Sequence, residues 1–423
     1  MTDNSNKSHD PRTPEEWVKA ARLRINKWDE DGLTLVHLAA AQGRVDVLKW
    51  LKSHGAKIKA KTRFEGRLPM FFAAENGHVE AIAWLKKRGA KVNIQSNFRE
   101  TPMLVAAENG HLNAMKRLKK YGAKVNVKGS LDRTPMFEAA AGGHIDVMMW
   151  LEEQGADVNA KEDRGWTPMF DAAEGGHVEA MAWLEERGAK ANVTTCRGTT
   201  PMFHAAQGGH IEAMKWLRER GAEINVTSEE GSTPMSGAAH RGHVAAMAWL
   251  REQGAAIDVA DKYGWTPMSW AACSGNLEAM MWLKEQGAEV NVRAHNGWVP
   301  MFSAAEHGYM QVAKWLKEQG ADVNARTENG STPMHQATTH QAPVEIMVWL
   351  KEQGADINAR DNKEETPMFW AAMSGHVAAM AWLKEQGVNI NAKTRNGRTP
   401  LSAARDSEHD EAVQWLLANG AHE

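Results

Sequence analysis

A motif that returns at a nearly constant interval constrains this chain more than any other feature. The string Thr-Pro-Met, or a close variant, followed by Ala-Ala recurs with nine gaps of 33 residues and two of 34. Its first position falls at Thr34, Leu68, Thr101, Thr134, Thr167, Thr200, Thr233, Thr266, Val299, Thr332, Thr366 and Thr399. A period of this length is typical of stacked supersecondary units. Length alone would divide 423 residues into two or three domains, but the repeat predicts one array.

Each unit carries the signals of two short helices. In the copy that begins at Thr167, this threonine is placed to cap a helix whose first residue is Pro168. A second helix follows a Gly-His turn, has apolar residues at helical spacing and ends at Gly188. A polar stretch with Asn and Gly then suits a hairpin turn. Because neither helix buries its apolar face alone, the units are predicted to stack into an all-α solenoid.

The unit Thr-Pro-x3-Ala-Ala-x2-Gly-His, followed by Leu and Gly-Ala-x-Val-Asn-Ala, resembles the ankyrin repeat over roughly residues 14–421. The resemblance implies an ankyrin-like helical solenoid with short β-hairpin loops. It also implies a partner-binding concave face made of hairpin tips and first helices. The sequence departs from the family pattern in three ways, one of which is a charged residue in place of the third leucine of the second helix in most units. Thr-Pro-Leu-His becomes Thr-Pro-Met-Phe or Thr-Pro-Met-Ser in most units, with the histidine kept at His37 and His335, and Trp replaces a leucine of the second helix.

The array divides into four predicted segments. Residues 1–12 are expected to be a flexible polar tail, and residues 13–33 a capping half-repeat with the first hairpin. The half-repeat opens with a capping box, Thr13-Pro14-Glu15-Glu16. Residues 34–398 are the stacked repeats. Residues 399–423 are a C-terminal capping repeat, because polar side chains such as Arg405 and Asp410 replace apolar ones on its outer surface.

Two regular series are expected to be structural. Twelve of the 18 tryptophans share one second-helix position, which predicts core packing: Trp17, Trp50, Trp84, Trp150, Trp183, Trp216, Trp249, Trp282, Trp315, Trp349, Trp382 and Trp415. Eight histidines share the Gly-His turn and are expected to cap the second helix: His78, His111, His144, His177, His210, His243, His376 and His409. Their regular spacing along the array argues against metal ligation.

The differences between copies indicate where a partner binds. Three positions are expected to face the groove: the residue directly before Thr-Pro, a semi-buried residue two before Ala-Ala, and an exposed residue directly before Ala-Ala. Five tryptophans outside the regular series fall on this face: Trp166, Trp265, Trp270, Trp298 and Trp370. Trp is enriched at binding hot spots, so these residues, together with Tyr263, form the candidate site for a protein partner. The alternative is that each Trp packs on a neighbouring hairpin as structural filler.

Charge is uneven although the whole chain carries a net charge of only −3. Residues 51–133 hold 18 Lys+Arg against 6 Asp+Glu, whereas residues 134–423 hold 24 against 39. A basic region of this kind could hold nucleic acid, a phosphorylated or nucleotide ligand, or an acidic protein surface. A solvated face is the alternative. The candidate anion-binding residues are Lys57, Lys59, Lys61, Arg63, Arg67, Lys86, Lys87, Arg88, Lys116, Arg117, Lys119 and Lys120.

Neither catalysis nor metal binding is expected of this chain. Cys196 and Cys273 lie more than two units apart without a matching His and Asp, and no phosphate loop or metal-binding motif occurs. We therefore predict a non-enzymatic binding scaffold without cofactor or metal. No apolar run is long enough to span a membrane and no secretory signal is visible, which favours a cytoplasmic location. A monomer is expected, with self-association of the basic third and the acidic remainder as the alternative.

Overall fold

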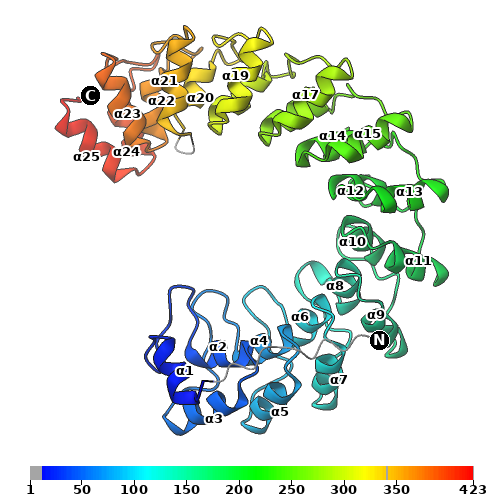
Figure 1. Cartoon of the computed structure of the whole chain (residues 1–423). Helices are drawn as coiled ribbons and strands as arrows, with labels where there is room; N and C mark the ends of the chain where they lie inside the picture. Colours follow the sequence, from blue (N-terminus) through cyan, green and yellow to red (C-terminus); the bar gives the residue numbers. More distant parts are fainter. Residues whose placement is uncertain (1–11, 340–341, 423) are drawn as a thin grey trace. The chain divides into compact units, whose positions relative to one another are not determined.

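The computed structural model describes residues 12–339 and 342–422, and within that range it is all helical, with 25 α-helices, one 3-10 helix and no strand (Figure 1). The predicted all-helical solenoid is confirmed. The first helices of the repeats are α2 (Leu35–Ala41), α4 (Pro69–Glu75), α6 (Pro102–Glu108), α8 (Pro135–Ala141), α10 (Pro168–Glu174), α12 (Pro201–Gln207), α14 (Pro234–Arg241), α16 (Pro267–Cys273), α18 (Pro300–Glu306), α20 (Pro333–Gln336), α22 (Pro367–Met373) and α24 (Pro400–Asp406).

The second helices are two residues longer in most repeats. They are α3 (Val45–Ser53), α5 (Val79–Lys87), α7 (Leu112–Lys120), α9 (Ile145–Glu153), α11 (Val178–Glu186), α13 (Ile211–Glu219), α15 (Val244–Glu252), α17 (Leu277–Glu285), α19 (Met310–Glu318), α21 (Val344–Glu352), α23 (Val377–Glu385) and α25 (Asp410–Ala418). Helix α1 (Pro14–Ala20) precedes them, and the 3-10 helix η1 (Ser130–Asp132) lies in one loop. The part of the predicted tail before Arg12 lies outside the described residues.

Local chemistry explains where the helices begin. Thr101 has extended backbone angles and its hydroxyl accepts a hydrogen bond from the Leu104 amide at 3.3 Å. Pro102 follows as the first helical residue, where its missing N–H costs nothing. At α1, Thr13 and Glu16 form the reciprocal capping box that the sequence indicates. The repeated Thr-Pro therefore sets the start of most first helices.

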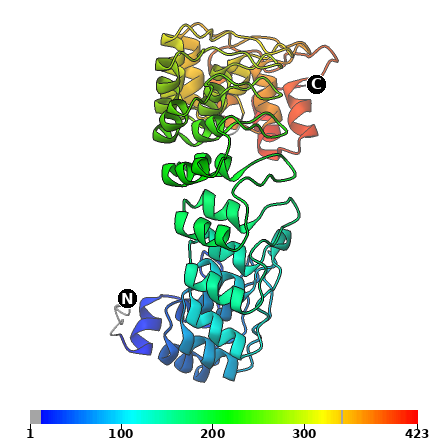
Figure 2. The same ribbon diagram turned by 90° about the vertical axis from the view of Figure 1, so that its right-hand side faces the viewer.

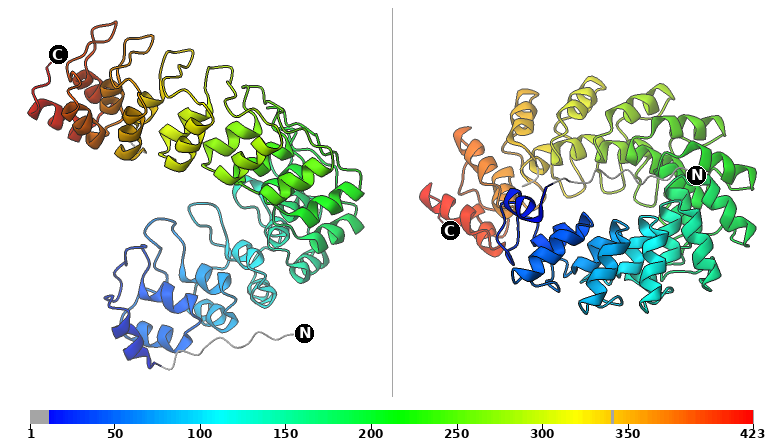
Figure 3. Two further views of the ribbon diagram at one scale, coloured as in Figure 1. Left: turned by 45° about the horizontal axis from the view of Figure 1, so that its top comes forward. Right: turned by 60° about the horizontal axis from the view of Figure 1, so that its bottom comes forward.

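The chain divides into two compact units. Unit 1 comprises Met1–Cys196 and Glu212–Ala222, and unit 2 comprises Arg197–Ile211 and Glu223–Glu423. Within each unit, first helices pack on first helices of adjacent repeats, as α2, α4 and α6 do in unit 1 and α14, α16 and α18 in unit 2. The loops of a unit project from the same side of its helices (Figures 2 and 3). Residues in equivalent positions of successive loops therefore become neighbours.

The loops differ from the β-hairpins that the resemblance implies. Most described loops are closed by a backbone hydrogen bond, such as that from the Glu162 amide to the Trp166 carbonyl at 3.0 Å. A second bond joins such a loop to the next loop, as from the Cys196 amide to the Arg164 carbonyl at 2.8 Å. Two backbone hydrogen bonds per loop are too few for a ladder of paired strands, and the loops are therefore turns.

The turn histidines occupy the predicted position but make a different bond. His177 stands at the N-cap of α11, yet its side chain makes no capping bond. Instead, its Nε2 lies 2.9 Å from the carbonyl oxygen of Ala141, the last residue of α8 in the preceding repeat. The ring lies over Gly143, where an added Cβ would sit 2.5 Å from the imidazole and where φ is +66°. His78 and His144 make the same bond to Ala41 and Glu108, so these three histidines tie one repeat to the next.

The core consists of small, sulfur-containing and aromatic side chains. The phenylalanines two residues before Ala-Ala, expected to be semi-buried, are the largest fully buried side chains in five repeats: Phe71, Phe137, Phe170, Phe302 and Phe369. The second-helix tryptophans are only partly in this core. Trp17, Trp84, Trp150, Trp183, Trp216 and Trp349 are buried, and the other six are half-buried. Arg187 covers Trp183 at 4.0 Å and pairs with Glu152 one repeat earlier.

Candidate functional site

The five irregular tryptophans are half-buried and none is fully exposed. The expectation that the residue directly before Ala-Ala is exposed is wrong, because this position lies against neighbouring first helices. Trp270 and Trp370 at this position are half-buried, and Ser303 and Gln336 are buried. Each indole ring therefore has one part in contact with the protein and another part exposed to solvent.

Trp265 and Trp270 form a cluster of their own in unit 2. Their ring centroids lie 5.1 Å apart, and His240 meets the Trp270 ring edge-on at 5.3 Å. Tyr263 projects from the same loop and is 52% exposed, with the Lys262 ammonium 5.0 Å from its ring. In unit 1, Trp166 leans on Phe170 at 5.0 Å. Trp166, Trp265 and Trp270 thus each contact another aromatic ring of the fold.

Trp298 and Trp370 line one pocket of unit 2 with a volume of about 300 Å³. Contacts with neighbouring side chains hold both indole rings in place. Trp298 leans on Phe302 at 5.0 Å and its Nε1 donates to the Ser303 hydroxyl at 3.0 Å. Trp370 meets His335 edge-on at 5.4 Å. The rest of the wall is polar: Asn296, Thr327, Asn329, Ser331, Gln336, Asp361, Asn362, Lys363 and Glu365.

The polar wall of this pocket is fixed by its own loops. The Asp361 Oδ1 accepts hydrogen bonds from the amides of Lys363 and Glu365 at 2.9 and 2.8 Å. The hydroxyls of Thr327 and Ser331 lie 2.8 Å apart. Burial and the Asp361 carboxylate raise the pKa of Glu365 above its ordinary value. Lys363, Trp370 and Arg398 lower the pKa of Glu365 in opposition, so the site combines two positioned indoles with a carboxylate whose charge is only partly compensated.

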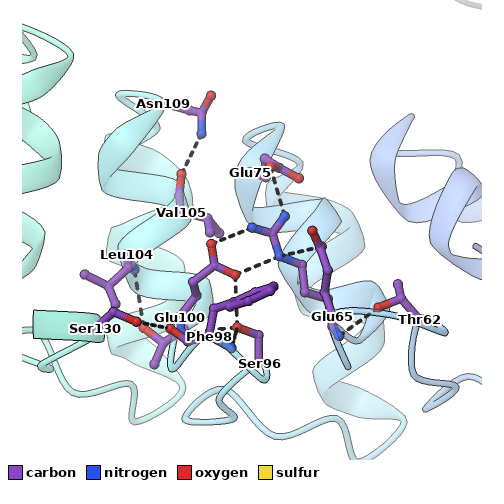
Figure 4. A network of polar contacts seen from close by, with 12 residues as sticks. Thr62, Glu65, Glu75, Ser96, Phe98, Glu100, Leu104, Val105, Asn109 and Ser130 are labelled. Atoms are coloured by element: carbon purple, nitrogen blue, oxygen red, sulfur yellow. Dashed lines mark hydrogen bonds and ion pairs between the residues drawn. The ribbon is translucent and has the colours of Figure 1, made fainter. Parts of the chain in front are cut away.

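A second polar system crosses the repeats of unit 1 (Figure 4). Arg67, one of the predicted anion-binding residues, contacts Glu65, Glu75 and Glu100 through its guanidinium. This contact set leaves Arg67 little capacity for an external anion. Burial acts to raise the pKa of Glu100, but the hydrogen bonds and charge of Arg67, together with a hydrogen bond from Ser96, hold it below its ordinary value.

Arg133 makes an equivalent network further along unit 1. Its Nε lies 3.0 Å from Glu138 and its Nη2 lies 3.0 Å from Asp171. Burial raises the pKa of Asp171 to about 7, against the opposing effect of Arg133. Glu100, Glu138 and Asp171 thus place carboxylates beside both arginines that stand in the position directly before Thr-Pro in unit 1.

The predicted basic residues lie elsewhere, on the loops and at the ends of second helices. Nine of them are exposed: Lys57, Lys59, Lys61, Arg63, Lys87, Arg88, Lys116, Lys119 and Lys120. Lys86 and Arg117 are half-buried. Lys116, Arg117 and Lys120 of α7 line a depression of about 430 Å³ with Val79, Glu80 and Asn113. Within residues 12–339 and 342–422, these three cations form no ion pair, so their charge is available to a ligand.

No group of three or more His, Cys, Asp or Glu among the described residues could hold a metal ion. Burial raises the pKa of the Cys273 thiol, which disfavours the nucleophilic thiolate. No described helix is long and apolar enough to cross a membrane.

Sequence reasoning missed Glu365 and the polar wall around it. Glu365 belongs to the row of residues directly before Thr-Pro, one in each repeat. Alignment of the row would have shown that Glu100 has an arginine one repeat earlier, whereas Glu365 has Ser331 there. That difference was the available signal.

Comparison with known proteins agrees with the geometry. The family model for ankyrin repeats in three copies matches residues 15–96, 70–162, 154–228, 220–294, 282–361 and 342–423. A similar solved structure is the human ASB11 ankyrin repeat domain, with 25% identity and a TM-score of 0.43 over 52% of this chain and 98% of that one. No curated protein matches the chain. Ankyrin repeats are generally protein–protein interaction scaffolds, and with matches across nearly its whole length this chain belongs to the ankyrin repeat family.

Proposed function

We propose that this chain binds a protein partner through the pocket between Trp298 and Trp370. The observation that carries the proposal is the pocket itself. It joins two half-buried indoles from repeats that are not adjacent, and both rings are held in place by internal contacts. Large rigid aromatic rings in a preformed recess give contact area at little cost in conformational entropy. An extended segment of a partner is the expected occupant.

The test is a selection of displayed 12-residue peptides against the whole chain. We expect selected peptides to bind the double variant Trp298→Ser/Trp370→Ser at least about thirtyfold more weakly, as loss of a hot spot implies. Serine is a fair replacement because Ser331 and Ser303 occupy the same two positions in other repeats.

The matched control is Trp265→Ser/Trp270→Ser, which removes two tryptophans from the same two positions outside the pocket. It should leave affinity unchanged. Peptides that bind the pocket variant as well as they bind the unaltered chain would refute the proposal. Circular dichroism of both variants verifies that the helices remain.

A second candidate function is binding of nucleic acid or a phosphorylated or nucleotide ligand by the basic surface of unit 1. It is favoured by the depression that Lys116, Arg117 and Lys120 line without an ion pair in the described part of the chain. Cations that are free to neutralise phosphates release counterions from the ligand when it binds. The dependence of binding affinity on salt concentration therefore tests whether the ligand is an anion of this class.

Binding of a labelled single-stranded oligonucleotide should weaken by on the order of tenfold or more between about 50 and 200 mM salt. The variant Lys116→Gln/Arg117→Gln/Lys120→Gln should show a smaller salt slope. Lys284, Lys351 and Lys384, which lie at second-helix ends in unit 2, supply the matched Lys→Gln control. Equal slopes for the two variants, or no binding at low salt, would remove this candidate.

A further inference from the structure

Glu100 and Glu365 occupy the same position in their repeats, directly before Thr-Pro, but their surroundings differ. Glu100 receives a two-pronged contact from the Arg67 guanidinium, with Nε 2.9 Å from Oε2 and Nη2 2.6 Å from Oε1. Arg67 holds the equivalent position one repeat earlier, 33 residues back. A guanidinium and a carboxylate match in this geometry, which makes the contact both strong and specific. Unit 1 therefore shows what a carboxylate at this position takes as a partner.

At Glu365 no arginine fills the corresponding place, because the residue one repeat earlier is small. Ser331 stands where Arg67 stands in unit 1, and its side chain is too short to reach across a repeat. Arg398, in the following repeat, pairs with Asp406 at 2.6 Å and lies over the Phe369 ring. Within residues 12–339 and 342–422, no side chain forms a direct ion pair with Glu365, and the charges of Lys363 and Arg398 act on it only from a greater distance. The carboxylate therefore keeps its capacity for a cationic partner.

The space that an arginine side chain would fill at this position is part of the pocket between Trp298 and Trp370. Ser331, Glu365, Trp298 and Trp370 all line it. Indole faces attract planar cations, and a guanidinium loses less hydration than an ammonium when it enters such a site. Lys363, which also lines the pocket, is exposed, and with Asp361 and Glu365 it leaves a surplus negative charge.

We propose that the pocket receives an arginine side chain of the partner, with Glu365 binding the guanidinium and the two tryptophans contacting its plane. This inference rests on the proposed function, because it names the chemistry of the group that enters the same pocket. Arginine is favoured over lysine because the Arg67–Glu100 pair is two-pronged. The partner's arginine thus takes the place beside Glu365 that Arg67 takes beside Glu100 in unit 1.

The experiment uses the full chain labelled with 5-fluorotryptophan and followed by ¹⁹F NMR. The signals of Trp298 and Trp370 are identified by Trp→Phe variants. The probes are N-acetyl-arginine amide and N-acetyl-citrulline amide, which have nearly the same shape but differ in charge. We expect arginine amide to shift both signals and citrulline amide to bind at least about tenfold more weakly.

Two variants locate the effect. Glu365→Gln should lose the difference between the probes, whereas Glu364→Gln, whose exposed carboxylate pairs with Arg360, should keep it. Ser331→Arg should fill the pocket from within and abolish the shifts. The fold accepts arginine at this position, because the Arg398 amide donates to the Thr394 hydroxyl four residues earlier, as the Ser331 amide donates to Thr327. Ser232→Arg, at the same position in another repeat, is the control and should leave the shifts unchanged.

The outcomes separate this inference from the proposed function. Equal shifts with both probes, or no shift with arginine amide at millimolar concentration, would overturn the arginine assignment. Displayed peptides that need both tryptophans but contain no arginine would also overturn it while leaving the proposed function intact. Displayed peptides that ignore the tryptophans would refute the proposed function itself, whatever the amides do.

Discussion

Phe137→Ala should destabilise the repeat that contains α8 by about 3–5 kcal/mol, the range for truncation of a fully buried aromatic ring. Phe137 is 0% exposed and lies between first helices that pack closely on both sides. Removal of the ring leaves a cavity that short, tightly stacked helices have little freedom to close. Because stability in a repeat array is a sum of local terms, the loss should be concentrated in α8 and its neighbours.

Native-state hydrogen exchange is the suitable measurement, since it reports the opening free energy of each repeat separately. The control is Phe203→Ala in unit 2. Phe203 occupies the same position but is half-buried, with its ring against Gly237 rather than a larger side chain. Its loss should be clearly smaller. Equal losses at Phe137 and Phe203 would mean that burial does not set the stability of these repeats.

The fold could be predicted from the sequence because every level of the repeat agrees. The Thr-Pro start, the turn glycine and the apolar spacing of both helices all indicate the same two-helix unit, and twelve copies remove ambiguity. The details that failed are contacts between repeats. His177 was expected to cap its own helix but bonds to Ala141 in the preceding repeat. Such a contact depends on how two units stack, which the pattern within one unit does not contain.

The candidate site was predictable only in part. The sequence singled out Trp298 and Trp370, and they do line one pocket, whereas Trp265 and Trp270 pack on each other. Their common position in the repeat could not separate these two pairs, because the separation depends on neighbours about 33 residues away. Arg67 shows the same limit. Its charge indicated an anion site, but Glu100 one repeat later occupies its guanidinium.

Arg133→Met should destabilise unit 1 by about 2–4 kcal/mol near pH 8, because it leaves the buried Asp171 carboxylate without its counter-charge. The estimate lies below the range for fully buried pairs, since the Arg133 side chain is 23% exposed. Methionine keeps most of the volume and apolar contact of the arginine stem. The measured loss therefore reports mainly charge.

The loss should depend on pH in a definite direction. The pKa of Asp171 in the folded chain is about 7, above its ordinary value of 3.8, so the folded state binds this proton more tightly than the unfolded state. Its contribution to stability is therefore most favourable at low pH and declines as the pH rises from about 4 to 7. Without Arg133 the pKa rises further. Near pH 5 the carboxyl group is then neutral, and the variant should lose much less stability than near pH 8.

A double variant separates this charge effect from packing. Arg133→Met/Asp171→Asn removes both charges, and an amide has nearly the shape of the carboxyl group. Its stability near pH 8 should exceed that of Arg133→Met, and its dependence on pH through this range should be weaker. Glu138, the other partner of Arg133, is unchanged in both variants and serves as a common background. If the single variant lost the same free energy near pH 5 and near pH 8, the ionised Asp171 would not be the cause, and the loss would have to come from the packing of the arginine stem.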